Sequence, residues 1–259
     1  MNGRAPSGTP SGPSTRRAQD LPWASAAMRE LEDDIACASR CDARVMLSGE
    51  SGAGKKFVAQ LIHQRSHRGS APFVIVNDGD IATSLPQSRR GSASAQPYKR
   101  GRLKTADNGT LLIDEIQKVP APVQLQLLQF TEREMANGSD LRLMTAASTD
   151  AFEPVRSNRF RSDLFYRLNV IHVIIPALRD RPEDIPILFR HYLSFYARAD
   201  VPRISTAAWE RLAAYPWPGN VTELKAAAET LAAQDLPRLV EPDDLPSHIG
   251  RWALRHRAP

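Results

Sequence analysis

The stretch Gly49-Glu50-Ser51-Gly52-Ala53-Gly54-Lys55-Lys56 lies between a short apolar run and an amphipathic segment. The run before it, 44–48, reads RVMLS, and the segment after it, 56–67, places apolar residues at helical spacing. Between a strand and a helix, the pattern G-x-x-x-x-G-K predicts a phosphate-binding loop. Its backbone N–H groups would surround phosphate oxygens, the helix N-terminus would add positive potential, and Lys55 would reach the β and γ phosphates of a nucleotide.

The last position of this motif departs from the usual pattern. Lys56 stands where a Ser or Thr hydroxyl ordinarily binds Mg²⁺, so we expect the metal site to be weakened or rearranged. Taken alone, the motif is also compatible with an ordinary Gly-rich turn.

A second polar pair follows an apolar run further along the chain. Residues 110–116 read TLLIDEI, which predicts a strand that carries Asp114 and Glu115 to its C-terminal end, where ligands bind in open α/β sheets. Asp114 would hold Mg²⁺ through water, and Glu115 would polarise the attacking water as a general base. The alternative is a polar strand end that caps a helix. Because both motifs occur in the right order, nucleotide binding is the favoured interpretation.

The pattern around these motifs predicts an α/β fold with a doubly wound parallel sheet, followed by a small all-helical lid domain. Helix-like segments separate short apolar runs at 44–48, 73–76, 110–113, 141–145 and 170–175. After Pro176 only helical patterns follow, at 183–196, 206–215 and 221–234. We expect a disordered tail at 1–20, a nucleotide-binding domain at 21–176, the lid at 177–249 and a C-terminal tail at 250–259.

Composition excludes several other classes of protein. The 259 residues carry a net charge of +5 and contain no apolar run of the roughly 18 residues that a membrane helix needs. The first 20 residues resemble no secretory signal, so a cytoplasmic location is expected. His63 and His67 lack a third ligand and are interpreted as surface histidines. A basic stretch at 87–105 is interpreted as a solvated loop, with nucleic-acid contact as the weaker alternative.

Five further segments extend the pattern along the chain: SAAM at 25–28, GRLKTADNGTLLIDE at 101–115, FRSDLFYRL at 160–168, PALRDRPEDI at 176–185 and WPGNV at 217–221. With the phosphate loop, these segments resemble the central AAA+ ATPase domain of bacterial enhancer-binding proteins, the activators of sigma-54 RNA polymerase. The resemblance covers residues 21–249. It implies ATP and Mg²⁺ as cofactors and a ring of subunits with ATP at each boundary.

The resemblance also implies roles for individual residues. Arg161 and Arg167 would reach into the neighbouring subunit's site, where a guanidinium neutralises charge on the transferred phosphoryl group. Asn77 matches a switch residue that restrains the catalytic glutamate, and Ser148 aligns with the sensor that contacts phosphate or water. Surface ion pairs remain the alternative for the arginines, and a strand-end turn remains the alternative for Asn77.

Two departures from the family bear on function. The loop that grips sigma-54 in these activators reads Gly-Ala-Phe-Thr-Gly-Ala, whereas residues 91–95 read GSASA here. Thr222 aligns with an arginine that joins lid closure to the γ phosphate, so turnover is expected to be impaired. Because residues 91–95 lack the Phe and Thr of the gripping loop, contact with sigma-54 is expected to be weakened. No DNA-binding helix-turn-helix is expected after residue 249.

Two functions remain open at this point. One is an ATP-binding and ATP-hydrolysing regulator of transcription that works as a homo-oligomeric ring. The other is a catalytically degenerate module that holds nucleotide and joins a related AAA+ protein in a hetero-oligomer.

Overall fold

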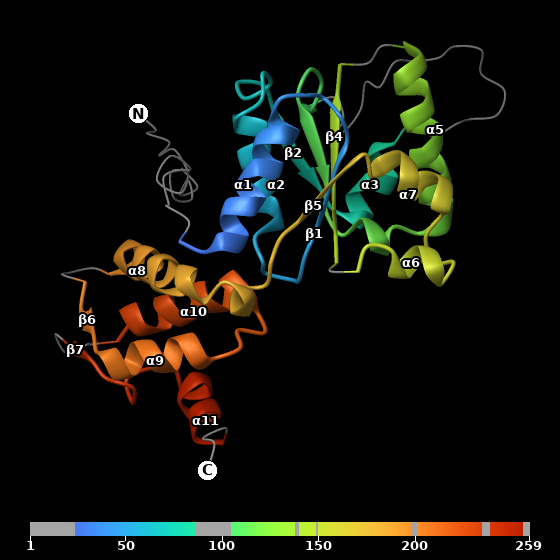
Figure 1. The fold of residues 1–259 in the computed structure, drawn as a ribbon. Helices are drawn as coiled ribbons and strands as arrows, with labels where there is room; N and C mark the ends of the chain where they lie inside the picture. Colours follow the sequence, from blue (N-terminus) through green and yellow to red (C-terminus); the bar gives the residue numbers. More distant parts are fainter. Residues whose placement is uncertain are drawn as a thin grey trace, which may run out of the picture.

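Five parallel strands form the first domain's sheet, in the order β2-β3-β4-β1-β5 (Figure 1). The computed structural model describes residues 24–85, 105–137, 140–148, 150–197, 201–234 and 239–255. The strands are β1 (Val45–Ser48), β2 (Phe73–Val76), β3 (Thr110–Ile113), β4 (Arg142–Ala147) and β5 (Ile171–Ile174). Each coincides with one of the five predicted apolar runs, so the prediction of a parallel α/β sheet is confirmed.

Alternate residues of the central strands bury against opposite faces of the sheet. Val45 and Leu47 pack with helices α1 (Ala26–Ser39) and α2 (Lys55–Gln64), whereas Met46 belongs to the apolar cluster on the other face. That second face is covered by α3 (Asp78–Ser84), α5 (Ala121–Asn137) and α7 (Ser162–Leu168). Burial on both faces explains why the strands read as continuous apolar runs rather than as alternating ones.

The remaining short elements connect the strands and lead into the second domain. They are α6 (Glu153–Arg156) and three 3-10 helices, η1 (Ile116–Lys118), η2 (Leu178–Asp180) and η3 (Pro182–Asp184). Among the helices of the described segments, none has the length and apolar character that crossing a bilayer requires.

The second domain is helical and has its own core around the fully buried Trp217. It contains α8 (Ile185–Tyr196), α9 (Thr206–Ala214), α10 (Asn220–Ala232) and α11 (Ser247–Arg255), with one small parallel pair, β6 (Arg203–Ile204) and β7 (Leu239–Val240). The Ser205 side chain caps α9 by accepting a hydrogen bond from the backbone N–H of Ala208. Because α11 runs from 247 to 255, the boundary predicted at 249 falls inside a helix.

One sequence interpretation is wrong. His63 is buried, not on the surface: its ring lies 2.9 Å from the Thr110 hydroxyl and 3.1 Å from the Ala71 carbonyl oxygen. Burial lowers the pKa of this imidazole, as expected for a cation moved out of water. The predicted tail at 1–20 and the altered loop at 91–95 lie outside the described residues.

Candidate functional site

The carboxyl ends of the strands carry the phosphate loop, the acidic pair, Asn77 and Ser148 to one edge of the sheet, which faces the helical domain (Figure 1). Ser48 at the end of β1 pairs with Ala147 at the end of β4, so the phosphate loop and Ser148 leave the sheet side by side. Val76 pairs with Ile113 in the same way, so Asn77 leaves the sheet beside Asp114. Parallel strands thus gather segments that are far apart in the sequence.

The phosphate loop, residues 49–55, wraps around the N-terminus of α2. Gly52 and Gly54 have φ angles of +76° and +111°, which few residues other than glycine adopt. The Lys55 ammonium donates hydrogen bonds to the carbonyl oxygens of Gly49 at 2.7 Å and Glu50 at 2.9 Å. Burial lowers the pKa of Lys55, while the nearby carboxylates of Asp114 and Glu115 act in the opposite direction. The loop and the acidic pair therefore occupy one site.

A direct ion pair joins the two motifs. The Asp114 Oδ2 lies 2.8 Å from the Lys56 ammonium, and its Oδ1 accepts a hydrogen bond from the Glu115 backbone N–H at 3.0 Å. Glu115 itself adopts a left-handed backbone conformation with φ of +51°, and its carboxylate lies 2.6 Å from the Lys118 ammonium. This pairing raises the pKa of Lys118. The carboxylate expected to act as general base is thus paired within its own chain.

Asn77 and Ser148 are both exposed at the same edge of the sheet. Asn77 precedes α3 without a side-chain capping bond, although its backbone carbonyl accepts hydrogen bonds from Asp80 and Ile81. Ser148 directly follows β4. Their positions agree with contact to a bound nucleotide, and their roles remain predictions.

Arg161 directly precedes α7 and Arg167 lies in its last turn, on the face of the sheet opposite α2. The Arg161 guanidinium forms a bidentate pair with Asp163, at 3.1 and 2.6 Å, which raises the pKa of Arg161. The Arg167 guanidinium lies 3.6 Å from the Glu132 carboxylate. The surface ion pair weighed as the alternative for Arg161 is therefore present in the single chain.

Asn220, at the start of α10, binds the lid domain to the phosphate loop. Its buried side-chain NH₂ group donates to the Glu50 carboxylate and to the Ser51 carbonyl oxygen, each at 3.0 Å, and its oxygen accepts from the Leu178 backbone N–H at 2.8 Å. The Arg179 guanidinium also forms a bidentate pair with Glu50, at 2.8 and 2.6 Å. These contacts hold the pKa of Glu50 at about 2, with Arg179 as the largest cause.

The backbones of the two domains also meet at Gly52. A methyl group added there would lie 2.2 Å from the Gly219 carbonyl oxygen and 3.1 Å from the Thr222 hydroxyl oxygen. The Val221 N–H donates to the Gly52 carbonyl oxygen at 3.0 Å. The residue that aligns with the family's lid arginine, Thr222, therefore lies against the phosphate loop.

Two buried charged residues complete this junction. The Arg181 guanidinium donates to the Ala53 carbonyl oxygen at 2.8 Å. The Asp184 carboxylate accepts from the backbone N–H groups of Ala24 and Ser25 and from the Ser25 hydroxyl. Sequence reasoning assigned no role to Asn220, Arg179, Arg181 or Asp184, although the segments PALRDRPEDI and WPGNV contain all four.

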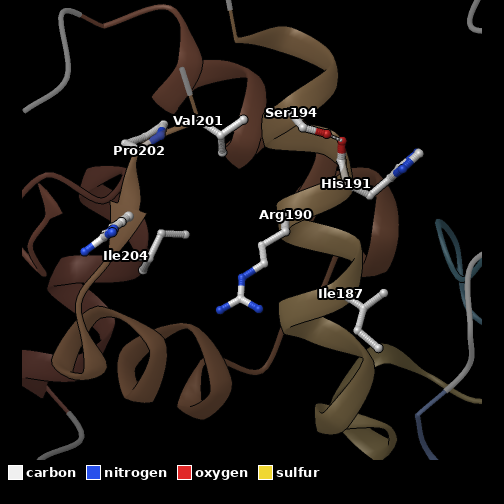
Figure 2. A pocket seen from close by; sticks show the side chains of 8 residues that line it. Ile187, Arg190, His191, Ser194, Val201, Pro202 and Ile204 are labelled. Atoms are coloured by element: carbon white, nitrogen blue, oxygen red, sulfur yellow. Dashed lines mark hydrogen bonds between the residues drawn. The ribbon is translucent and has the colours of Figure 1, made fainter. Parts of the chain in front are cut away.

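A separate hollow of about 630 Å³ lies in the helical domain, between α8 and the segment that leads into β6. Figure 2 shows the Arg190 side chain directed into it, with Ile187 and Ser194 on the same helix and Val201 and Ile204 across from them. The Arg190 guanidinium carbon lies 5.0 Å from the centre of the Trp209 ring, a cation–π distance. None of the predicted site residues lines this hollow.

Comparison with known proteins places this geometry in a family. A family model described as the sigma-54 interaction domain matches residues 21–174. The chain belongs to this family. A second model, described as an AAA+ ATPase lid domain, matches residues 179–258, so this sigma-54 interaction domain is followed by its lid.

Similar proteins are transcription regulators. The regulatory protein AtoC of Escherichia coli K12 is 38% identical over 242 residues, which are 87% of this chain and 52% of AtoC. NtrC of Rhizobium meliloti is 38% identical over 225 residues, 81% of this chain and 46% of NtrC. The chain therefore spans about half the length of these curated relatives.

A solved structure supports the same placement. NtrX from Brucella abortus in complex with ATP is 31% identical and superposes with a TM-score of 0.73, covering 91% of this chain and 59% of that one. The structure of NtrX in complex with ADP superposes with a TM-score of 0.74 at 30% identity.

Proposed function

We propose that this sigma-54 interaction domain binds ATP at the phosphate loop and serves as the nucleotide-binding module of a transcription regulator. The observation that carries the proposal is the contact between Lys56 and Asp114, because it brings the two halves of the nucleotide site together at one sheet edge. The backbone N–H groups of residues 49–56 would surround the phosphates, and Lys55 would leave the carbonyl oxygens that it now contacts. The ATP complex of NtrX supports this reading.

Hydrolysis in this proposal requires a second subunit. Arg161 directly precedes α7 and Arg167 lies in its last turn, across the sheet from α2, and in this proposal both would serve the site of a neighbouring copy. Glu115 would act as general base once it leaves Lys118, with Asn77 and Ser148 orienting the water and the γ phosphate. The assembly would be a homo-oligomeric ring or a mixed ring with a related AAA+ protein.

The partner and the location follow from the family as proposals. We propose sigma-54 as the target, with a weakened contact because residues 91–95 lack the Phe and Thr of the gripping loop. A regulator of this polymerase would act in the cytoplasm. The Mg²⁺ role of Asp114 remains a prediction.

A second candidate function is a degenerate, nucleotide-holding subunit that modulates an intact relative. Two observations favour it: Asp114 is paired with Lys56, and the general-base candidate Glu115 is paired with Lys118. In such a subunit ATP would order the junction between the phosphate loop and the lid without being consumed.

The ATPase rate per subunit, measured against protein concentration, separates the two candidates. A rate that rises with concentration and disappears in Arg161→Ala supports sites shared between subunits. Arg159→Ala is the matched control, because Arg159 is exposed on the preceding loop and its guanidinium contacts Glu153 and Ser157, which are close to it in the sequence. A rate of zero at every concentration, together with ATP binding, supports the degenerate subunit.

A further inference from the structure

The side chain at position 56 changes the charge of the nucleotide site. Lys56 lies in the first turn of α2, next to Lys55, and its ammonium lies 2.8 Å from the Asp114 Oδ2. The other carboxylate oxygen of Asp114 accepts the Glu115 backbone N–H. Asp114 is 9% exposed, so both of its oxygens are committed to these neighbours in a largely buried position.

These residues do not fit the magnesium site that the motif ordinarily forms. Mg²⁺ requires near-octahedral oxygen ligands at about 2.0–2.1 Å, and phosphate loops supply one of them from a Ser or Thr hydroxyl at the position of Lys56. Here that position carries a cation, and the cation is bound to the carboxylate that would hold the metal. Within the described residues, no group of three or more His, Cys, Asp or Glu side chains is arranged to hold a metal ion.

The carboxylates around the loop are already neutralised by cations of the same chain. Asp114 pairs with Lys56, Glu115 with Lys118, and Glu50 with Arg179. Lys55 remains as an additional positive charge, hydrogen-bonded to backbone carbonyl oxygens. A triphosphate that enters the loop would therefore meet net positive charge. No divalent ion would be needed to shield the phosphates from these paired acids.

We propose that the Lys56 ammonium, held by Asp114, takes the place of magnesium, so that the site binds ATP without a divalent metal ion. The proposal rests on the proposed ATP binding. An ammonium has three donors, and the pair with Asp114 uses one of them, which leaves donors for phosphate oxygens. Lysine suits this position because its charge is compact and lies at the end of a flexible stem; 56% of the Lys56 side chain is exposed, so a ligand can reach the donors that the pair with Asp114 leaves over.

Isothermal titration with ATP, in excess Mg²⁺ and in excess EDTA, tests the proposal on the whole chain. The expected dissociation constants in the two buffers agree within about threefold. Loss of ATP binding in EDTA, with binding retained in Mg²⁺, would overturn the metal-free site. Absence of binding in both buffers would instead overturn the proposed ATP binding, so the two failures are distinguishable.

Three variants test the role of Lys56 itself. Lys56→Gln removes the charge without supplying a hydroxyl and should weaken ATP binding in EDTA by about tenfold or more. Lys56→Ser supplies the missing hydroxyl, so its binding should become dependent on Mg²⁺. Lys225→Gln removes an exposed lysine on α10 and should change neither value. Equal binding in EDTA by Lys56→Gln and the wild type would overturn the role of Lys56.

Manganese supplies a readout that is independent of affinity. Electron paramagnetic resonance of Mn²⁺ with a non-hydrolysable ATP analogue should show a protein-bound ion with Lys56→Ser and none with the wild-type chain. A protein-bound ion in the wild type would contradict the replacement. Melting curves without nucleotide identify any variant that fails to fold, and the wild-type comparison of Mg²⁺ with EDTA decides the question without any variant.

Discussion

The Asn220 amide lies 3.0 Å from the Glu50 carboxylate, so one buried side chain of the lid fixes a charged residue of the phosphate loop. The two residues are 170 positions apart. Because Asn220 also binds the Ser51 carbonyl and the Leu178 N–H, the lid and the loop share one hydrogen-bond network. A change in the loop on nucleotide binding would therefore reach the lid directly.

Replacement of Asn220 by Ala should destabilise the protein by about 2–4 kcal/mol, since it leaves the buried Leu178 N–H unpaired and places Ala at a φ of +52°. Urea unfolding measures the loss. Asn158→Ala is the matched control, because Asn158 has a φ of +54° but is exposed. Equal losses in the two variants would show that backbone strain, and not the network, sets the effect.

Glu50→Gln should lower stability by about 0.5–1.5 kcal/mol at pH 7, because it removes the charge that pairs with Arg179. The pKa of Glu50 is lowered from 4.5 to about 2 in the folded chain, so the ion pair contributes fully above pH 4.5 and its contribution is lost as the pH falls toward 2. Melting temperatures of the wild type and the variant should therefore converge over this range. A difference that stays constant down to pH 2 would contradict the assignment, and Arg179→Gln completes a double-mutant cycle.

Gly52→Ala should disrupt the junction between loop and lid, because the new methyl group would lie 2.2 Å from the Gly219 carbonyl oxygen. We expect a loss of at least about 2 kcal/mol in thermal unfolding without nucleotide. Gly54→Ala serves as the control: its φ is also positive, at +111°, yet nothing lies within 4 Å of the added carbon. If both variants melted at the same temperature, the close contact with Gly219 would make no contribution to the loss of stability.

Arg142 offers a contrasting test of buried charge. It is 1% exposed and donates from Nη2 to the Ala38 carbonyl oxygen, but its Nε and Nη1 atoms have no hydrogen-bond partner among the described residues. Arg142→Met should therefore leave stability unchanged or raise it by up to about 2 kcal/mol.

The matched control for this test is Arg68→Met. Arg68 is 8% exposed and pairs with Asp42 and Asp140. Its replacement should cost about 2 kcal/mol, because it removes the buried donors to the Asn108 and Asp140 carbonyl oxygens together with the ion pairs. A comparable loss in the Arg142 variant, measured by urea unfolding, would contradict the account.

The sequence was sufficient to predict the elements whose signal is local. Strands buried on both faces read as apolar runs, and the glycines of the phosphate loop lie directly before the helix that follows them. The strands and the phosphate loop are therefore both predictable from the sequence. The register of parallel strands then carried Asp114 to the loop as expected. These features depend on neighbouring residues and on one general rule of sheet topology.

Contacts between distant segments were not predictable in the same way. The burial of His63 depends on Thr110 and on the Ala71 carbonyl, and the pairing of Lys56 with Asp114 depends on how two motifs approach each other. Nothing in the sequence near Asn220 indicates that its amide meets Glu50. Such contacts arise from tertiary packing, which leaves no periodic signal in the sequence.

Calorimetric titration of the wild-type chain and of Lys55→Ala with ATP tests the central claim, that the loop at 49–55 binds a triphosphate. Saturable heat with the wild type, and a loss of about tenfold or more in affinity in the variant, is the predicted result. A wild-type chain that takes up no ATP, or a variant that binds it equally well, would contradict the account.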